Sequence, residues 1–129
     1  METKQVIVIR KDLNMRKGKC VAQGAHASMK VFFDRMVQRD GTYTIPNHKV
    51  SEAMQEWMSG TFTKVCVSVS SESELLDVYQ RAKDLGIPCS LITDAGKTEF
   101  GGVPTRTAVA IGPDEVSKID PITGHLPLL

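Results

Sequence analysis

The feature that most constrains the fold of this chain is the alternation of short apolar runs with longer segments of helical period. The first run, Val6–Ile9, consists of four consecutive β-branched residues, which is typical of a strand buried on both faces. Strands are predicted at 4–10, 61–70, 89–93 and 105–112. Helices are predicted at 19–39, at 49–58, from Ser71 to Gly86, and from Pro113 to a break at Pro121. The order β-α-α-β-α-β-β-α predicts an α/β fold with a central sheet covered by helices on both faces.

The bulk composition is that of an ordinary globular domain. With 129 residues, 41% hydrophobic and 24% charged, the chain is expected to form one domain, residues 1–129, with its own core. No apolar run approaches the roughly 20 residues that span a bilayer, and the N-terminus has no signal-peptide pattern, so no membrane partner is expected.

The cysteines and histidines indicate neither a disulfide framework nor a metal site. The three cysteines, Cys20, Cys66 and Cys89, lie far apart in or beside apolar runs, which predicts buried free thiols. The three histidines are scattered, and no C-x-x-C or H-x-x-x-H spacing occurs. An intracellular, reducing compartment and a site without metal are therefore expected.

Charge is distributed unevenly along the chain. Residues 1–39 contain nine Lys or Arg and three Asp or Glu, whereas residues 40–129 contain seven and twelve, although the net charge is only +1. A basic first third favours an anionic partner bound on one face, although a solvated surface without any partner gives the same composition.

The predicted helix at 19–39 carries two rows of side chains at helical spacing. Lys19, Gln23, His26 and Lys30 form a polar row, the first candidate for a functional site. The second row is apolar and is expected to pack in the core. It consists of Val21, Ala25, Met29, Phe32 and Met36.

A second candidate lies in the glycine-rich segment between the third and fourth strands. Asp94 ends a predicted strand, and ligands gather at the carboxyl ends of strands in sheets of this class. If the first and third strands run parallel, Asp94 comes close to Lys19, Gln23 and His26. The alternatives are that Asp94 only caps its own turn and that His26, among alanines, is structural.

Several catalytic classes are excluded by the motifs. Lys17-Gly18-Lys19 resembles a phosphate contact, but it lacks the upstream glycine and the Ser or Thr of a nucleotide-binding P-loop. No G-x-S-x-G signature is present, and nothing in the sequence supports a covalent route through Cys20.

Five blocks, in order along nearly the whole chain, resemble the type-2 peptidyl-tRNA hydrolases. They are Arg10-Lys-Asp-Leu-Asn-Met-Arg-Lys-Gly-Lys19, Ala22-Gln-Gly-Ala-His-Ala27, Thr93-Asp-Ala-Gly-Lys-Thr98, Ala110-Ile-Gly-Pro113 and Ile122-Thr-Gly-His-Leu126. The resemblance implies an α/β/α sandwich with a four-stranded mixed sheet, often dimeric. It also implies a cytoplasmic enzyme without a cofactor that hydrolyses the ester joining a peptide to the 3′ end of tRNA.

The same resemblance implies the site residues. Lys19, Asp94 and Thr98 match the catalytic group, while the substrate-binding or supporting positions are Arg10, Asp12, Lys17, Gln23, His26 and Gly96. A water attacking the ester directly is the economical mechanism, with Asp94 orienting it or accepting its proton, Thr98 holding it and Lys19 stabilising negative charge. Lys19 as the base is the alternative. The tRNA backbone is expected to contact Arg10, Lys11, Arg16, Lys17 and Lys30.

This chain departs from the family pattern in two segments. After Asp-Ala-Gly the family commonly has Arg-Thr-Gln-Ile, whereas this chain has Lys97-Thr-Glu-Phe100 and then, with one extra residue, Gly-Gly-Val-Pro104. Either Thr105 or Thr107 then matches the family's later threonine. The segment 40–49 is longer than usual. Three alternatives follow: a non-catalytic member that binds tRNA or protein, an RNA-binding module, and a hydrolase of another acyl ester of a nucleotide or RNA.

Overall fold

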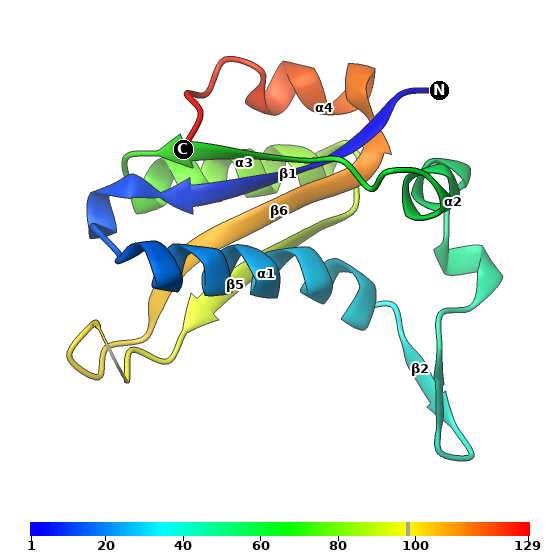
Figure 1. Ribbon diagram of the computed structural model, residues 1–129, viewed down its shortest axis with the longest axis horizontal. Coiled ribbons are helices and arrows are strands. Elements are labelled where there is room, and N and C mark those ends of the chain that lie inside the picture. The colour runs from blue at the N-terminus through cyan, green and yellow to red at the C-terminus, as the bar shows by residue number, and fades with distance from the viewer. Residues whose placement is uncertain (98) are drawn as a thin grey trace.

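The computed structural model, which describes residues 1–97 and 99–129, contains a four-stranded sheet with helices on both faces (Figure 1). The strands of this sheet are β1 (Thr3–Arg10), β4 (Lys64–Val69), β5 (Cys89–Asp94) and β6 (Thr105–Glu115). The helices are α1 (Lys17–Phe33), α2 (Glu52–Ser59), α3 (Glu72–Asp84) and α4 (Val116–Thr123), with 3₁₀ turns at Lys11–Leu13 and Asn47–Lys49. The expected α/β/α sandwich with a four-stranded mixed sheet is confirmed.

The strand order brings the two predicted site segments to one edge of the sheet. The order is β4-β1-β6-β5, with β1 parallel to β4 and β6 antiparallel to both β1 and β5. Since β1 and β5 therefore run in the same direction, their carboxyl ends, Arg10 and Asp94, lie at the same edge.

Alternate residues of each strand build two separate cores. Val6 and Val8 face α3 and α4 in a core of large aliphatic side chains, whereas Ile7 and Ile9 face α1. The α1 core contains mostly small partners from the neighbouring strand, such as Ala108 and Ala110. The chain's continuous Val-Ile-Val-Ile run is thus explained, because both faces of β1 are covered.

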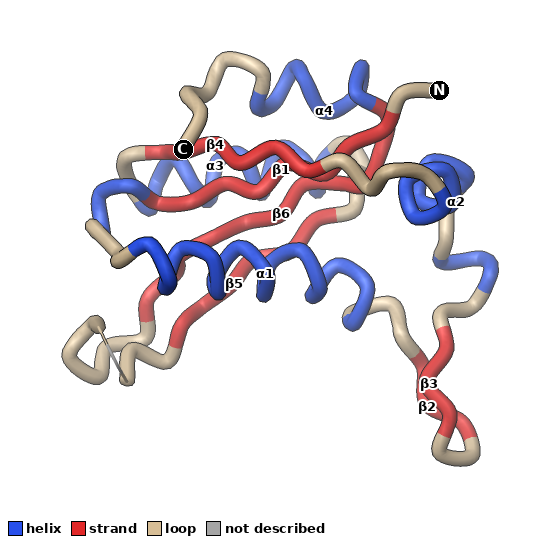
Figure 2. Tube along the Cα trace, viewed as in Figure 1, coloured by secondary structure: helices blue, strands red, loops and turns tan. Residues whose placement is uncertain are grey.

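The first helix is shorter than the expected 19–39, because its last residues form a hairpin. The strands β2 (Val37–Arg39) and β3 (Thr42–Thr44) pair across Asp40-Gly41, where φ is 51° and 78°. Two consecutive positive φ values define the two-residue turn that joins antiparallel strands, and Asp-Gly is a strong signal for it. The hairpin extends away from the sheet beyond the end of α1 (Figures 1 and 2).

The prediction that the apolar row of α1 packs in the core is wrong for four of its five members, and only Phe32 among them packs against the core. Val21 and Met29 are 69% and 51% exposed, whereas the buried face consists of Gln23, Gly24, Ala27, Ser28 and Val31. Small residues bring α1 close to the sheet, since a Cβ at Gly24 would stand 3.4 Å from Ile7. The exposed row therefore borders an apolar groove of about 480 Å³, whose other walls include Ile7 and Cys66.

The cysteines, Trp57 and the last helix complete the comparison of the predicted elements with the structure. The three cysteines are unpaired, but Cys66 is exposed because it lies on the edge strand β4, and the other two are only partly buried. Trp57 of α2 is buried in the core and stacks on Phe32. The last helix begins at Val116 and continues two residues beyond Pro121. Within the described residues, no helix is long and apolar enough to cross a membrane.

Candidate active site

An ion pair joins the two predicted segments at the sheet edge. Lys19, in the first turn of α1, donates from Nζ to Asp94 Oδ1 at 2.9 Å, and both side chains are 16% exposed. Asp94 is the last residue of β5, so its side chain is fixed by the sheet while its oxygens face the start of α1. The structure thus brings Lys19 and Asp94 together across 75 residues of sequence.

Two further donors hold the Asp94 carboxylate. Gln23 donates from Nε2 to Oδ1 at 3.4 Å, and the backbone N–H of Gly96 donates to Oδ2 at 2.9 Å. Gly96 has φ of 80°, and a Cβ there would collide with the backbone of Val103. The turn after β5 therefore needs glycine at this position in order to aim its N–H at the carboxylate.

These donors lower the pKa of Asp94 below its ordinary value of 3.8. The largest cause is the hydrogen bond from Lys19, and the Gly96 N–H, the charge of Lys19 and the Gln23 amide act in the same direction against partial burial. The carboxylate is therefore ionised at neutral pH and is a weak proton acceptor, but it is a strong hydrogen-bond acceptor for a water molecule.

Thr107, one of the two candidate threonines of β6, extends the hydrogen-bond network beneath Asp94. Its Oγ1, which is fully buried, donates to Gln23 Oε1, whereas Thr105 donates to the carbonyl of Val103. The pairing of β5 with β6 shifts at this point, since Ile92 pairs with Ala108 and the next residue pairs with Arg106. This β-bulge turns Thr107 to the same side as its neighbour Ala108, toward α1.

Arg10 and Asp12 form a separate cluster at the same edge. Arg10 donates to both oxygens of Asp12 at 3.2 and 2.7 Å and to the carbonyl of Arg106 at 3.0 Å. Glu72, the first residue of α3, lies 3.8 Å from the guanidinium groups of both Arg10 and Arg106. The hydrogen bonds that Arg10 donates to Asp12 lower the pKa of Asp12. Within the described part of the chain, neither Arg10 nor Asp12 forms a hydrogen bond or ion pair with the Asp94 side chain.

The remaining predicted site residues are distributed around the ion pair. Lys17 is exposed at the first turn of α1 and lines the apolar groove. His26 is exposed two turns along α1, and among the described residues the hydrogen bonds to Asp94 come from Lys19, Gln23 and Gly96 instead. Thr98 lies outside the described residues, between Lys97 and the exposed Glu99.

Sequence reasoning missed Phe100, which lies beside the ion pair. Its ring centroid is 5.7 Å from Lys19 Nζ, and no spacing rule connects position 100 with position 19. Over residues 1–97 and 99–129, no group of three or more His, Cys, Asp or Glu is arranged to hold a metal ion.

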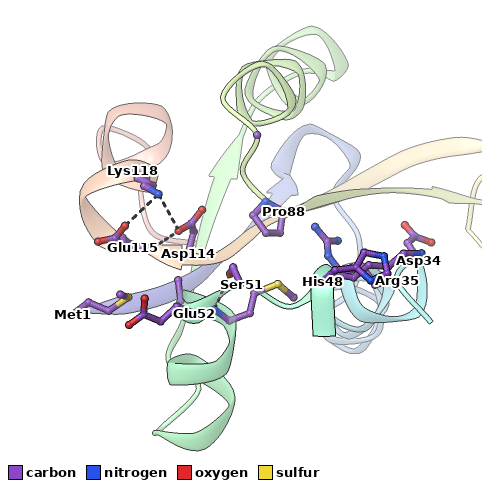
Figure 3. A pocket seen from close by; sticks show the side chains of 14 residues that line it. Met1, Asp34, Arg35, His48, Ser51, Glu52, Pro88, Asp114, Glu115 and Lys118 are labelled. Carbon is purple, nitrogen blue, oxygen red and sulfur yellow. Dashed lines mark hydrogen bonds and ion pairs between the residues drawn. The ribbon is translucent and has the colours of Figure 1, made fainter. Parts of the chain in front are cut away.

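A cavity of about 690 Å³ is lined by Met1, Pro88 and Asp114, which lie at the ends of β1, β5 and β6 opposite to Asp94. Asp114, Glu115 and Lys118 line one side of it, and Arg35 and His48 line the other (Figure 3). Lys118 pairs with Glu115 at 3.2 Å, so charges of both signs are already partnered there. This cavity shares no residue with the predicted site.

Comparison with known proteins agrees with the motif assignment over nearly the full chain. Residues 3–129 match the family described as peptidyl-tRNA hydrolase PTH2. A peptidyl-tRNA hydrolase from Methanocaldococcus jannaschii is 48% identical over 126 residues, covering 98% of this chain and 99% of that protein. Proteins with the same name from Methanothermobacter thermautotrophicus and Sulfurisphaera tokodaii are 40% and 39% identical, with coverage of 98% or more on both sides.

Proposed function

The chain belongs to the PTH2 family of peptidyl-tRNA hydrolases, and we propose that it performs this hydrolysis at the Lys19–Asp94 pair. Water adds to the carbonyl carbon of the ester between the peptide, or an N-blocked aminoacyl group, and the 3′-terminal ribose. The bond from that carbon to the ribose oxygen then breaks, and a proton from the water passes to the ribose oxygen. The products are a peptide carboxylic acid and a tRNA that can be charged again.

The observation that carries this proposal is the way Asp94 is held. Two donors on α1 and one in the loop after β5 fix both of its oxygens, and its pKa is lowered chiefly by the hydrogen bond from Lys19. We assign Asp94 the role of orienting the attacking water, since a carboxylate with a lowered pKa is a poor general base.

Lys19 supplies the positive charge for the reaction. Its ammonium lies 2.9 Å from Asp94 Oδ1, so it stands next to the position where a water bound to that carboxylate meets the ester. It stabilises negative charge that develops on the carbonyl oxygen or on the leaving ribose oxygen. The assignment of Thr98 as a third member of this group depends on the family resemblance alone.

The basic residues at the start of α1 are suited to the tRNA backbone. Lys11, Arg16 and Lys17 are exposed and precede or begin the helix that carries Lys19. Arg10 and Lys30 contribute less free charge, because Arg10 is bonded to Asp12 and Lys30 pairs with Asp34 at 2.8 Å. Phosphate contacts of this kind make the dissociation constant for tRNA rise steeply with salt concentration.

We assign the apolar groove beside α1 to a second copy of the chain, giving a homodimer. Its lining is almost entirely apolar, and the exposed side chains beside it include Val21, Met29 and Leu129. Contiguous apolar surface of this kind is typical of protein interfaces. Light scattering is expected to give a dimer mass for the wild type and a monomer mass for Met29→Glu, whereas His26→Glu, a change at an exposed polar position of the same helix, leaves the dimer intact.

Peptidyl-tRNA arises during translation, so we place the reaction in the cytoplasm. The three unpaired thiols fit a reducing compartment.

The experiment that tests the function is release of an N-blocked aminoacyl group from its tRNA. The wild type is compared with Asp94→Asn and, as a matched control at the same sheet edge, with Asp12→Asn, all at equal folded concentration. We expect wild-type turnover, a loss of roughly a hundredfold or more in Asp94→Asn, and a change below about threefold in Asp12→Asn. Equal loss in both variants contradicts the assignment of the site, and a folded wild type that binds tRNA without turnover contradicts the activity.

A further inference from the structure

The loop between β5 and β6 folds back so that one aromatic residue returns to the ion pair. The N–H of Val103 donates to the carbonyl of Phe100 at 3.0 Å, and the two residues between them, Gly101 and Gly102, have φ of 59° and 81°. Positive φ at both central positions defines a tight turn that glycine adopts without strain. The N–H of Gly102 also donates to the carbonyl of Gly96 at 2.7 Å, which ties this turn to the residue that holds Asp94.

This turn presents the Phe100 ring to the ammonium of Lys19. The distance from Nζ to the ring centroid is 5.7 Å, within the range in which a cation is attracted by the face of an aromatic ring. Phe100 is partly buried and Lys19 is only 16% exposed, so water screens the attraction weakly.

Lysine has a long, flexible side chain whose ammonium has no preferred direction of its own. In this site it must remain beside Asp94 Oδ1 while a neutral ester acquires negative charge. The carboxylate fixes the ammonium from one side, and an aromatic face adds attraction for the cation without a negative charge that would compete with the developing oxyanion.

We propose that Phe100 is a positioning residue for Lys19, which holds the ammonium in its working position through a cation–π contact. This inference depends on the proposed role of Lys19 in ester hydrolysis. Because the ring acts on Lys19 and not on the tRNA, its removal lowers kcat and leaves KM for peptidyl-tRNA nearly unchanged.

The test compares three residues at position 100 in the same hydrolysis assay. Phe100→Leu keeps an apolar side chain but removes the aromatic face, and we expect kcat to fall about threefold to tenfold. Phe100→Tyr keeps the face and is expected to retain wild-type kcat. In the Lys19→Met background the substitution Phe100→Leu is expected to have no further effect on kcat, because the cation is already absent.

A spectroscopic measurement separates this inference from the function itself. The ring shields the Hε protons of Lys19, so their NMR signals are expected to move downfield in Phe100→Leu and to stay near the wild-type position in Phe100→Tyr. If the wild type has no activity, the proposed function fails while this shift still tests the contact. An active wild type whose Phe100→Leu variant keeps full kcat, or loses only affinity for tRNA, overturns the positioning role.

Discussion

Two acid–base clusters lie at the same edge of the sheet, one over each face. On the α1 face, Lys19 pairs with Asp94, and on the α3 face, Arg10 pairs with Asp12 and approaches Glu72. Both clusters lower the pKa of an aspartate through a hydrogen bond from a cation. They differ in what surrounds the cation.

The Arg10 guanidinium is surrounded by hydrogen-bond acceptors and a carboxylate from the same chain. It donates to both oxygens of Asp12 and to a carbonyl of β6, and Glu72 approaches from α3. One planar, rigid group thereby links three segments, which are residues 10–12, β6 and the start of α3. We interpret this cluster as a clamp that holds the sheet edge together, and the Lys19–Asp94 pair as the one that takes part in chemistry.

The substitution Lys19→Met provides the sharpest test of this difference. Removal of the charge that stabilises a developing oxyanion is expected to lower kcat by about a hundredfold to a thousandfold. The folded state is expected to persist, because methionine keeps the apolar stem of lysine. Rates under saturating substrate measure the loss, and a decrease of less than about tenfold would assign Lys19 to substrate affinity instead.

The substitution Thr107→Val is the next largest expected effect. It leaves the Gln23 carbonyl oxygen buried without its donor, so the amide that supports Asp94 loses its orientation. We expect kcat to fall about tenfold. Thr105→Val serves as the control, since the Thr105 hydroxyl donates to the carbonyl of Val103 in the adjacent loop, and similar losses in both variants would contradict the special role of Thr107.

The sequence predicted most of this arrangement from local patterns. The Val-Ile-Val-Ile run and the alternation of elements predicted the layers, and the strand order made Lys19 and Asp94 neighbours. The position of Thr107 was not predictable, because a β-bulge reverses the alternation on which such predictions depend. The prediction for the apolar row of α1 failed because helical spacing does not distinguish a row that packs in the core from one that lies on an exposed apolar surface. The helix packs on the sheet through small residues, which include Gly24, Ala27 and Ser28.

The substitution Arg10→Met tests the clamp on the other face. Loss of its bonds to Asp12 and to the carbonyl of Arg106 is expected to lower the free energy of unfolding by about 1–2 kcal/mol, because the Arg10 side chain is 11% exposed and that of Asp12 is 32% exposed. At a temperature where the variant stays folded, kcat is expected to remain within about threefold of wild type. Urea denaturation measures the first quantity, and a large loss of kcat with unchanged stability would make the two clusters alike.

The smallest expected effect is on the pH dependence of stability, and it separates the clusters by location, since the pKa of each aspartate depends on a different cation. Because hydrogen bonding from Lys19 lowers the pKa of Asp94, the ion pair stabilises the folded state above the ordinary value of 3.8. That contribution is lost as the pH falls through the lowered pKa of the folded protein. In Lys19→Met the pKa of Asp94 is expected to rise, so the stability difference from wild type shrinks below about pH 4. Carboxyl carbon NMR titration should show this rise at Asp94 and none at Asp12, whose lowered pKa depends on Arg10. A similar rise in the pKa of both aspartates would mean that Lys19 acts electrostatically on both clusters. The distinction between a catalytic ion pair and a structural clamp would then be wrong.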